Sequence, residues 1–553
     1  MGQSDKPQPD TPKADTLRVV LAQVNLLVGD VRGNLERVIA EARRARDSLQ
    51  AQLVLFPELT LSGYPPEDLL FHRGLRLQIE RAIVELRDAV PDIGIMVGFP
   101  EYDEGRIYNS AALLYQGREL ARHRKACLPN YRVFDEKRYF TPGSSPTVVD
   151  FHGFRLGLLI CEDIWEAEPV AAAGRAGAQA LMIINASPYE LHKQRERESV
   201  MAARIAEVRV PAAYVNLLGG QDELVFDGNS FAMDAQGHVT QRADAFRDRL
   251  ILVQFERQGD RVGLKPGDVA PELSDEQSVY RALVLGVHDY VTKHGFPGVV
   301  LGLSGGIDSA LTLALAVDAL GADKVHAVMM PSRYTSQMSL EDATAQAQLL
   351  GVSLSTITIE DMYQVTLRAL KDEFAGRKPD ATEENIQARC RGVLLMGISN
   401  KTGRMLLTTG NKSEMSVGYA TLYGDMAGGF APIKDCSKML VYRLARYRNS
   451  VAPTIPQRVI DREPTAELRH EQKDTDSLPP YDVLDPILEA FIEDDLSVEE
   501  ICERGFDRAV VGRVLDMVKR AEYKRRQAPP GVRVSRRAFG RDWRYPITNG
   551  YKR

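Results

Sequence analysis

The chain has 553 residues, of which 44% are hydrophobic and 26% charged, and its net charge at pH 7 is −6. Because typical domains hold roughly 100–200 residues, we expect at least two compact units. The acidic balance argues against nucleic acid as the main partner. No apolar run approaches the roughly 20 residues that span a bilayer, so no membrane segment is expected. A two-domain enzyme fits these limits.

Five cysteines are widely spaced and form no C-x-x-C pair. An odd number without such a pair disfavours a disulfide framework and a thiolate zinc site, and it favours a reducing cytoplasm. Residues 1–16 are polar and contain proline, so we expect a disordered tail there.

Two long segments carry the structural pattern. In residues 17–256, short apolar runs alternate with amphipathic ones: 17–24, 52–58, 94–101, 110–116, 154–162, 180–187 and 212–218 read as strands, and 34–49 as a helix. Residues 257–276 are rich in Gly, Pro, Asp and Glu, which favours a linker. In 277–553 a helix (278–295) precedes a strand–helix–strand–helix–strand succession over 298–359, which predicts a parallel sheet.

The sequence LSGGIDSA (303–310) follows an apolar strand and opens a helix. Backbone N–H groups at such a helix start bind anions. The lysine of the common phosphate loop, which assists γ-phosphoryl transfer, is missing. SGGIDS resembles the pyrophosphate loop of the N-type ATP pyrophosphatases, which cleave ATP between the α- and β-phosphates. That resemblance implies an Mg²⁺ ligand at Asp308 and ATP phosphates along Gly302, Leu303, Ser304, Gly305, Gly306, Ile307, Asp308 and Ser309.

Further motifs lie in the same half: ENIQARCRG (384–392), MLLTTGNKSE (405–414), TLYGDMAGGF (421–430), PIKD (432–435), REPTAELR, DSLPPYDVLD and EYKRRQAPPG. Together they resemble the synthetase domain of the NAD synthetase family. The resemblance implies ATP contacts at Thr409 and Lys434 and a second Mg²⁺ ligand at Glu414. It implies deamido-NAD⁺ contacts at Asn385, Arg389, Glu414, Asp425 and Lys524. TLYGDMAGG departs from the pattern of ammonia-dependent relatives, with Leu422 in place of a lysine and Gly429 in place of an aspartate.

Three reactive side chains stand at or just after strand ends in the first half: Glu58, Lys125 and Cys161. A cysteine nucleophile needs a base and a cation for the oxyanion, which Glu58 and Lys125 would supply. This order resembles the nitrilase superfamily of amide and nitrile hydrolases. The resemblance implies an αββα sandwich, a supporting Glu136, and glutamine contacts at Tyr131, Ser187 and Lys193.

The two halves together resemble the glutamine-dependent NAD⁺ synthetase family: an α/β nitrilase-like sandwich (17–256) followed by a Rossmann-like parallel sheet (277–553). This resemblance implies an ATP-dependent amide ligase that takes nitrogen from glutamine through a Cys161 thioester. It also implies Mg²⁺ as cofactor and a homo-oligomer, a dimer or larger.

Three alternatives are weaker. A tRNA-modifying pyrophosphatase calls for a basic surface and often for paired cysteines. A GMP-synthetase-like enzyme calls for a Cys-His-Glu amidotransferase, and neither His152 nor His192 lies in a matching motif. A nucleotide-sensing module beside a dead amidase fold calls for loss of the nucleophile or the metal ligands, and all of these are present.

Overall fold

The computed structural model describes residues 15–259 and 261–551. Of the expected disordered tail (1–16), residues 1–14 lie outside the described part, and Thr16 already begins the first strand, β1. The chain divides into two units. Unit 1 runs to Glu272 except for residues 189–191 and 222–225, and these two short segments belong with 273–553 in unit 2.

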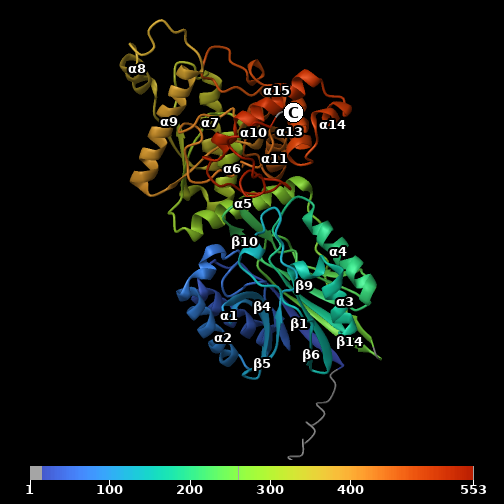
Figure 1. Ribbon diagram of the computed structural model, residues 1–553. Coiled ribbons are helices and arrows are strands. Elements are labelled where there is room, and N and C mark those ends of the chain that lie inside the picture. The colour runs from blue at the N-terminus through green and yellow to red at the C-terminus, as the bar shows by residue number, and fades with distance from the viewer. Residues whose placement is uncertain (1–14, 260, 552–553) are drawn as a thin grey trace, which may run out of the picture. The chain divides into compact units, whose positions relative to one another are not determined.

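Unit 1 is built on two sheets between two pairs of helices (Figure 1). The seven-stranded sheet has the order β15-β14-β1-β2-β3-β4-β5: Arg261–Leu264, Arg249–Gln258, Thr16–Gln23, Leu53–Leu55, Gly94–Asp103, Arg106–Tyr115 and Arg118–Arg124. The six-stranded sheet has the order β13-β12-β9-β8-β7-β6: Val239–Arg242, Phe231–Met233, Ala212–Asn216, Ala180–Asn185, Phe154–Ile160 and Thr147–Phe151. A separate hairpin joins β10 (Leu218–Gln221) and β11 (Leu224–Asp227).

The core of unit 1 lies between these sheets, where alternate residues such as Leu17, Val19 and Leu21 of β1 pack against Leu156 and Leu158 of β7. Helices α3 (Ala167–Arg175) and α4 (Lys193–Val208) cover the outer face of the six-stranded sheet through a second apolar cluster. Helices α1 (Val31–Leu49) and α2 (Arg73–Ala89) pack together on the seven-stranded sheet. This is the expected αββα sandwich.

Unit 2 contains a four-stranded parallel sheet of order β18-β17-β16-β19: Ser353–Thr356, Val325–Met329, Val299–Gly302 and Met405–Leu407. The helices are α5 (Asp275–Lys293), α6 (Ile307–Leu320), α7 (Gln337–Leu350), α8 (Glu360–Ala369), α9 (Ala381–Thr402), α10 (Lys412–Val417), α11 (Lys438–Val451), α12 (Gln457–Asp461), α13 (Tyr481–Ile492), α14 (Val498–Glu503), α15 (Arg508–Arg520) and α16 (Glu522–Arg525). The strand order reverses at β16, so β17 and β19 flank it. In parallel sheets, ligands bind at the carboxyl ends of strands beside such a reversal.

Residues 257–276 are more regular at their start than the sequence pattern indicates. They begin with the end of β14 and include β15, which pairs with it antiparallel, and they end in the first turn of α5. The polar and glycine-rich sequence of this edge hairpin lacks the alternation of apolar and polar residues by which a strand is recognised.

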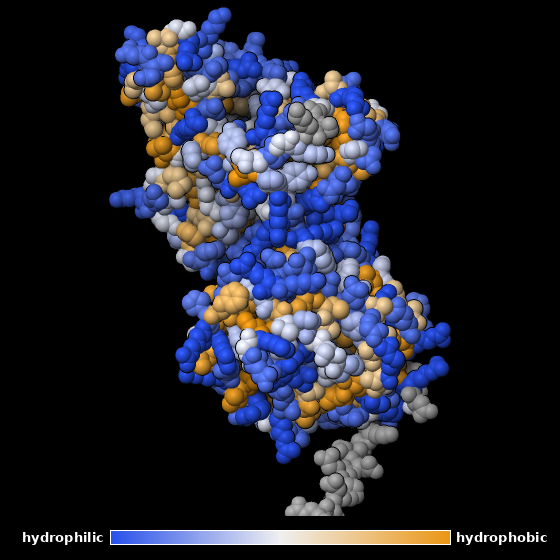
Figure 2. Space-filling view, in the orientation of Figure 1, coloured by the Kyte–Doolittle hydropathy of each residue, from blue (hydrophilic) through white to orange (hydrophobic). Residues whose placement is uncertain are grey.

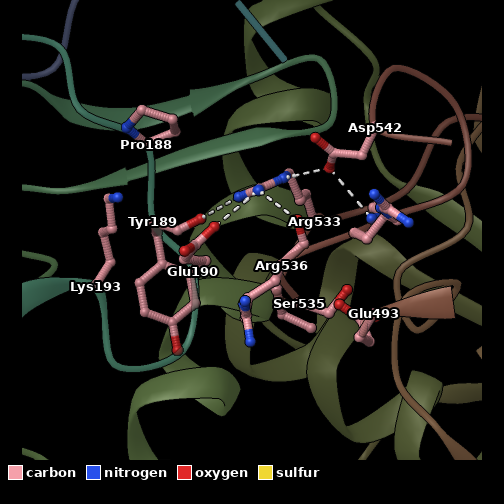
Figure 3. Close-up of polar contacts among 12 residues, drawn as sticks. Pro188, Tyr189, Glu190, Lys193, Glu493, Arg533, Ser535, Arg536 and Asp542 are labelled. Atoms are coloured by element: carbon pink, nitrogen blue, oxygen red, sulfur yellow. Dashed lines mark hydrogen bonds and ion pairs between the residues drawn. The ribbon is translucent and has the colours of Figure 1, made fainter. Parts of the chain in front are cut away.

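Arg533 organises the short segment 189–191 within unit 2 (Figure 3). Its guanidinium, 3% exposed, donates to Glu190 Oε2 at 2.8 Å, to Asp542 Oδ2 at 2.7 Å and to the Tyr189 carbonyl at 3.1 Å. A buried guanidinium needs such partners, because an unpaired charge in the interior is costly. Two acidic side chains neutralise it here.

Among the described residues, no helix is both long and apolar enough to cross a membrane. The face visible in Figure 2 mixes hydrophilic and hydrophobic residues on each unit.

Candidate functional site

The first candidate site lies in unit 1, where three segments bring the expected residues together. Glu58 follows β2, Lys125 follows β5 and Cys161 follows β7. Lys125 Nζ donates to Glu58 Oε1 at 2.7 Å and to both Glu136 oxygens at 2.9 and 2.8 Å. Cys161 has a backbone φ of 45°, in the left-handed region that side-chain-bearing residues rarely adopt. All four residues are at most 4% exposed.

Further hydrogen bonds fix the two carboxylates. Glu58 Oε1 accepts from Asn109 Nδ2 at 2.7 Å, and its Oε2 accepts from the Ala186 N–H at 3.0 Å. Glu136 Oε1 accepts from the Tyr64 hydroxyl at 2.9 Å. Neither Asn109 nor Tyr64 was expected from the sequence, because their spacing from the motif residues carries no pattern.

Burial and neighbouring charges together shift the pKa values in this cluster. Burial raises the pKa of the Cys161 thiol well above its usual range, and the charge of Glu58 adds to this while that of Lys125 opposes it. Burial alone would lower the pKa of Lys125, but the charges of Glu136 and Glu58 outweigh it and raise that pKa. A neutral thiol therefore lies among a carboxylate and an ammonium, an arrangement in which attack requires a base to take the thiol proton.

The three expected glutamine contacts lie on different segments of unit 1. The Tyr131 hydroxyl donates to Glu162, the residue after the cysteine, at 3.0 Å. Lys193 Nζ lies 4.2 Å from the centre of the Trp165 ring. Ser187 follows β8, and its Oγ accepts from Arg197 Nε at 3.0 Å.

Arg197 is a fully buried residue that the sequence reading missed. It also donates to Asp227 and to the carbonyls of Ser187 and Pro188. The guanidinium thus fills one acceptor position of the Ser187 hydroxyl, which also interacts with the buried Tyr214 side chain.

The second candidate site lies in unit 2 at the carboxyl ends of β16 and β19. The SGGIDS loop leaves β16, and Gly305 adopts φ +83°, where a Cβ would lie 2.5 Å from the Ser339 carbonyl oxygen. Ser304 Oγ and Ser309 Oγ lie 3.1 Å apart, and the Gly306 N–H donates to Ser304 Oγ at 3.2 Å. The loop is thus closed on itself and presents the first turn of α6, where backbone N–H groups favour an anion.

Two carboxylates share one ammonium beside this loop. Lys438 Nζ lies 2.5 Å from Asp308 Oδ2 and 3.3 Å from Glu414 Oε1, and Asn411 Nδ2 donates to Asp308 Oδ1 at 2.8 Å. Burial raises the pKa of Glu414 to about 8, opposed by Lys438 and reinforced by Asp308. Crowded acidic oxygens of this kind are the hard ligands that Mg²⁺ takes, commonly two from the protein and the rest from phosphates. The described residues contain no group of three or more His, Cys, Asp and Glu arranged to hold a metal.

Lys438 is the main omission of the sequence reading in unit 2. It begins α11, and a cation in the first turn opposes the helix dipole. A lysine in the first turn of a helix indicates that acidic side chains from other segments stabilise its charge.

A cavity of about 280 Å³ joins these features. Its lining includes the SGGIDS loop, Thr409, Glu414, Asp425, Lys438 and Arg462. Lys434, expected to contact ATP, instead donates to the Pro529 carbonyl at 2.7 Å and lines a smaller cavity of about 20 Å³, which shares Glu414 and Asp425 with the larger one.

The residues expected to contact deamido-NAD⁺ converge on the TLYGD loop. Asn385 accepts from the Thr421 hydroxyl at 2.7 Å, Asp425 accepts from the Thr421 N–H at 2.6 Å, and Arg389 donates to the Leu422 carbonyl at 3.2 Å. Lys524 donates to the carbonyls of Gly418 and Ala420, each at 2.7 Å. Asn385 and Arg389 therefore contact the TLYGD loop, Lys524 contacts the segment just before it, and Asp425, within the loop, also lines the cavity.

Comparison with known proteins gives both halves a family. A carbon-nitrogen hydrolase model matches residues 18–260, and an NAD synthase model matches residues 279–528. The chain is 47% identical to the glutamine-dependent NAD(+) synthetase of Acinetobacter baylyi, over 97% of this chain and 99% of that protein. It is 45% identical to that of Thermotoga maritima, again over 97% and 99%.

Among solved structures, a glutamine-dependent NAD⁺ synthetase from Acinetobacter baumannii in complex with ADP aligns with a TM-score of 0.79 and 45% identity, over 97% of this chain and 99% of that chain. This agreement extends over both units of the chain. The chain belongs to the glutamine-dependent NAD(+) synthetase family.

Proposed function

We propose that this enzyme converts deamido-NAD⁺, ATP and glutamine into NAD⁺, AMP, pyrophosphate and glutamate. The observation that carries the proposal is the buried Glu58–Lys125–Glu136 cluster beside Cys161, present in the same chain as a pyrophosphate-type loop with paired carboxylates. The first is suited to releasing ammonia from an amide, and the second to activating a carboxylate with ATP.

In the first reaction, the Cys161 sulfur attacks the glutamine side-chain carbonyl while Glu58 takes the thiol proton and then passes it to the departing ammonia. Lys125 donates toward the oxygen that becomes negative, and Glu136 holds the lysine in place. Water then cleaves the thioester to glutamate and restores the thiol. The raised thiol pKa supports this use of a base rather than a resting thiolate.

Glutamine recognition follows from the surrounding polar groups. Its α-carboxylate and α-ammonium need opposite charges, and Lys193 and Glu162 offer them, with Tyr131 hydrogen-bonded to Glu162. Ser187 adds a hydroxyl group oriented by Arg197.

In the second reaction, the carboxylate of deamido-NAD⁺ attacks the ATP α-phosphorus, pyrophosphate leaves, and ammonia displaces AMP from the acyl group. Residues 302–309 would bind the phosphates through backbone N–H groups, and Thr409 lines the same cavity. Lys434 faces the adjoining small cavity and would act on ATP only after giving up its bond to the Pro529 carbonyl. Asn385, Arg389, Asp425 and Lys524 would shape the loop that receives the deamido-NAD⁺.

Asp308 and Glu414 would hold Mg²⁺, which when bound neutralises phosphate charge as a Lewis acid. Lys438 contacts both side chains and is placed to balance their negative charge before Mg²⁺ binds. We further propose a homo-oligomer, as the family resemblance implies, and a cytoplasmic location, supported by five cysteines that are all free.

The test is an assay of AMP release with the purified full-length protein, ATP and Mg²⁺. AMP should form only when deamido-NAD⁺ is added, and NAD⁺ should follow when glutamine or ammonia is present. AMP release that depends on tRNA or on a purine nucleotide instead, or no AMP release under any condition, would contradict the proposal and favour one of the alternative functions.

A further inference from the structure

Asp163 is a fully buried carboxylate, two residues after Cys161, with no role in the chemistry above. Its Oδ1 accepts from the N–H groups of Ala126 and Cys127, both at 2.9 Å. Its Oδ2 accepts from the Ile160 N–H at 3.0 Å and lies 3.0 Å from His123 Nε2. The carboxylate therefore has four polar partners, three of them backbone N–H groups.

The backbone partners of Asp163 are the immediate neighbours of the reacting groups. Ala126 follows Lys125, and Ile160 precedes Cys161. One carboxylate thus ties the end of β5 to the end of β7, from two different sheets of unit 1. A shift of this carboxylate would move the lysine and the cysteine relative to each other.

The backbone conformation of Cys161 indicates what the hydrogen bonds of Asp163 stabilise. A non-glycine residue in the left-handed region is strained and persists only where its surroundings hold it. The hydrogen bond from Ile160 to Asp163 closes the turn that contains Cys161, whose φ is 45°. Asp163 is therefore placed to hold the nucleophile in its strained conformation.

We infer that Asp163 is a positioning residue for glutamine hydrolysis: its side chain sets the separation of the Cys161 sulfur and the Lys125 ammonium through the two backbones. The inference rests on the proposed role of Cys161 as nucleophile. Asp163 touches no reacting atom, so its loss should lower kcat for glutamine while leaving the binding of glutamine largely unchanged.

Asp163→Asn is the sharpest test, because the amide keeps one oxygen for Ala126 and Cys127 but turns an NH₂ group toward the Ile160 N–H. Since misplacement of about 1 Å can cost 100-fold, we expect glutaminase kcat to fall by about 100-fold, with KM within about threefold of wild type. Ammonia-supported NAD⁺ synthesis should keep its wild-type rate. Alkylation of Cys161 by iodoacetamide, corrected with a Cys161→Ala background, should show a changed pH profile.

Glu101→Gln is the matched control. Glu101 is also buried, on β3, and is bonded to Ser110, Arg122 and Arg124 but to none of the proposed catalytic residues. It should lower stability while leaving glutaminase kcat and the alkylation profile unchanged. Asp163→Glu, which keeps the charge but displaces it by one methylene, should also lower kcat if the position of the carboxylate matters, and it serves if the Asn variant does not fold.

Glutaminase kcat within about threefold of wild type in Asp163→Asn or Asp163→Glu would overturn the inference. So would an unchanged alkylation profile together with equal loss of glutamine- and ammonia-supported synthesis, since that combination indicates a general structural role. Failure of the proposed function is seen in a separate measurement. If Cys161→Ala keeps its glutaminase activity, Cys161 is not the nucleophile, whatever the result for the Asp163 variants.

Discussion

On the proposed mechanism, the use of glutamine depends on Cys161. Replacing it with alanine removes the sulfur that forms the thioester, so glutamine-supported NAD⁺ synthesis should fall to background. Synthesis from ammonium chloride should continue at the wild-type rate, because ammonia enters after that step. Parallel assays with the two nitrogen sources check this, and equal loss of both would contradict the assignment.

Asp308 is the counterpart in unit 2. Asp308→Asn removes a charged oxygen ligand while keeping the shape of the side chain, so synthesis from both nitrogen sources should fall by about 100-fold or more. The Mg²⁺ concentration for half-maximal rate should rise. Wild-type turnover with an unchanged Mg²⁺ titration would remove Asp308 from the metal site.

Glu101 provides a pH-dependent test of stability. Burial alone would raise its pKa, but hydrogen bonds from Arg124, Ser110 and Arg122 lower it from 4.5 to about 2. Because the folded-state pKa lies below the unfolded one, the stabilisation is full above pH 4.5 and is lost as pH falls toward 2. Glu101→Gln should cost about 2 kcal/mol near neutrality.

Urea unfolding of wild type and Glu101→Gln, from about pH 7 down to about pH 3, measures the difference directly. The gap in unfolding free energy should shrink as the pH falls. A gap that stays constant or grows toward acid would show that the charge of Glu101 does not stabilise the fold.

At the scale of elements, the loop between β16 and α6 contains a glycine that no other residue can replace without strain. Gly305→Ala adds a Cβ at φ +83°, 2.5 Å from the Ser339 carbonyl oxygen. Strain and the clash should shift the loop, so synthesis from both nitrogen sources should fall by at least about tenfold.

Gly321→Ala is the matched control at the other end of α6. Its φ is +85°, and a Cβ there meets no atom within 4 Å. It should cost some stability with little change in KM for ATP. If Gly305→Ala and Gly321→Ala change KM and kcat by similar factors, the contact between residue 305 and the Ser339 carbonyl does not matter for the use of ATP.

The strands differ in how well the sequence predicts them. The strands β8 and β16 are largely apolar and were expected, and the loops that follow them carried the recognisable motifs. Strand β5, RELARHR, is largely polar because it forms the edge of its sheet, and no periodicity marks it. Lys125 was nevertheless singled out, because the sequence RHRKACLPNY around it is recognisable even where the preceding strand is not.

Residues that act through tertiary contacts were missed for a different reason. Asp163 and Lys438 owe their roles to partners 37 and 130 positions away, Ala126 and Asp308. Local pattern carries no information about such pairs. The side chains proposed to touch substrates lie in recognisable motifs, whereas those that hold them in place are recognised only when the fold is known.

At the scale of the whole molecule, we predict that the ammonia released from glutamine is used in the second reaction before it equilibrates with bulk water. Ammonia in bulk water is mostly protonated and dilute, so delivery at high local concentration favours the second reaction. With unlabelled glutamine and excess ¹⁵N-ammonium, the NAD⁺ amide should contain mostly unlabelled nitrogen. Label matching the proportion in solution would mean that ammonia equilibrates with solvent.

The allocation of residues 189–191 and 222–225 to unit 2 bears on any attempt to dissect the enzyme. A fragment that starts at residue 273 lacks Glu190, so the buried Arg533 loses one of its two acidic partners, a loss that typically costs about 3–5 kcal/mol. A fragment that ends at 272 carries two segments that belong with the other unit. No single cut therefore yields two complete parts, and a gene for either activity alone would need more than a new start or stop codon.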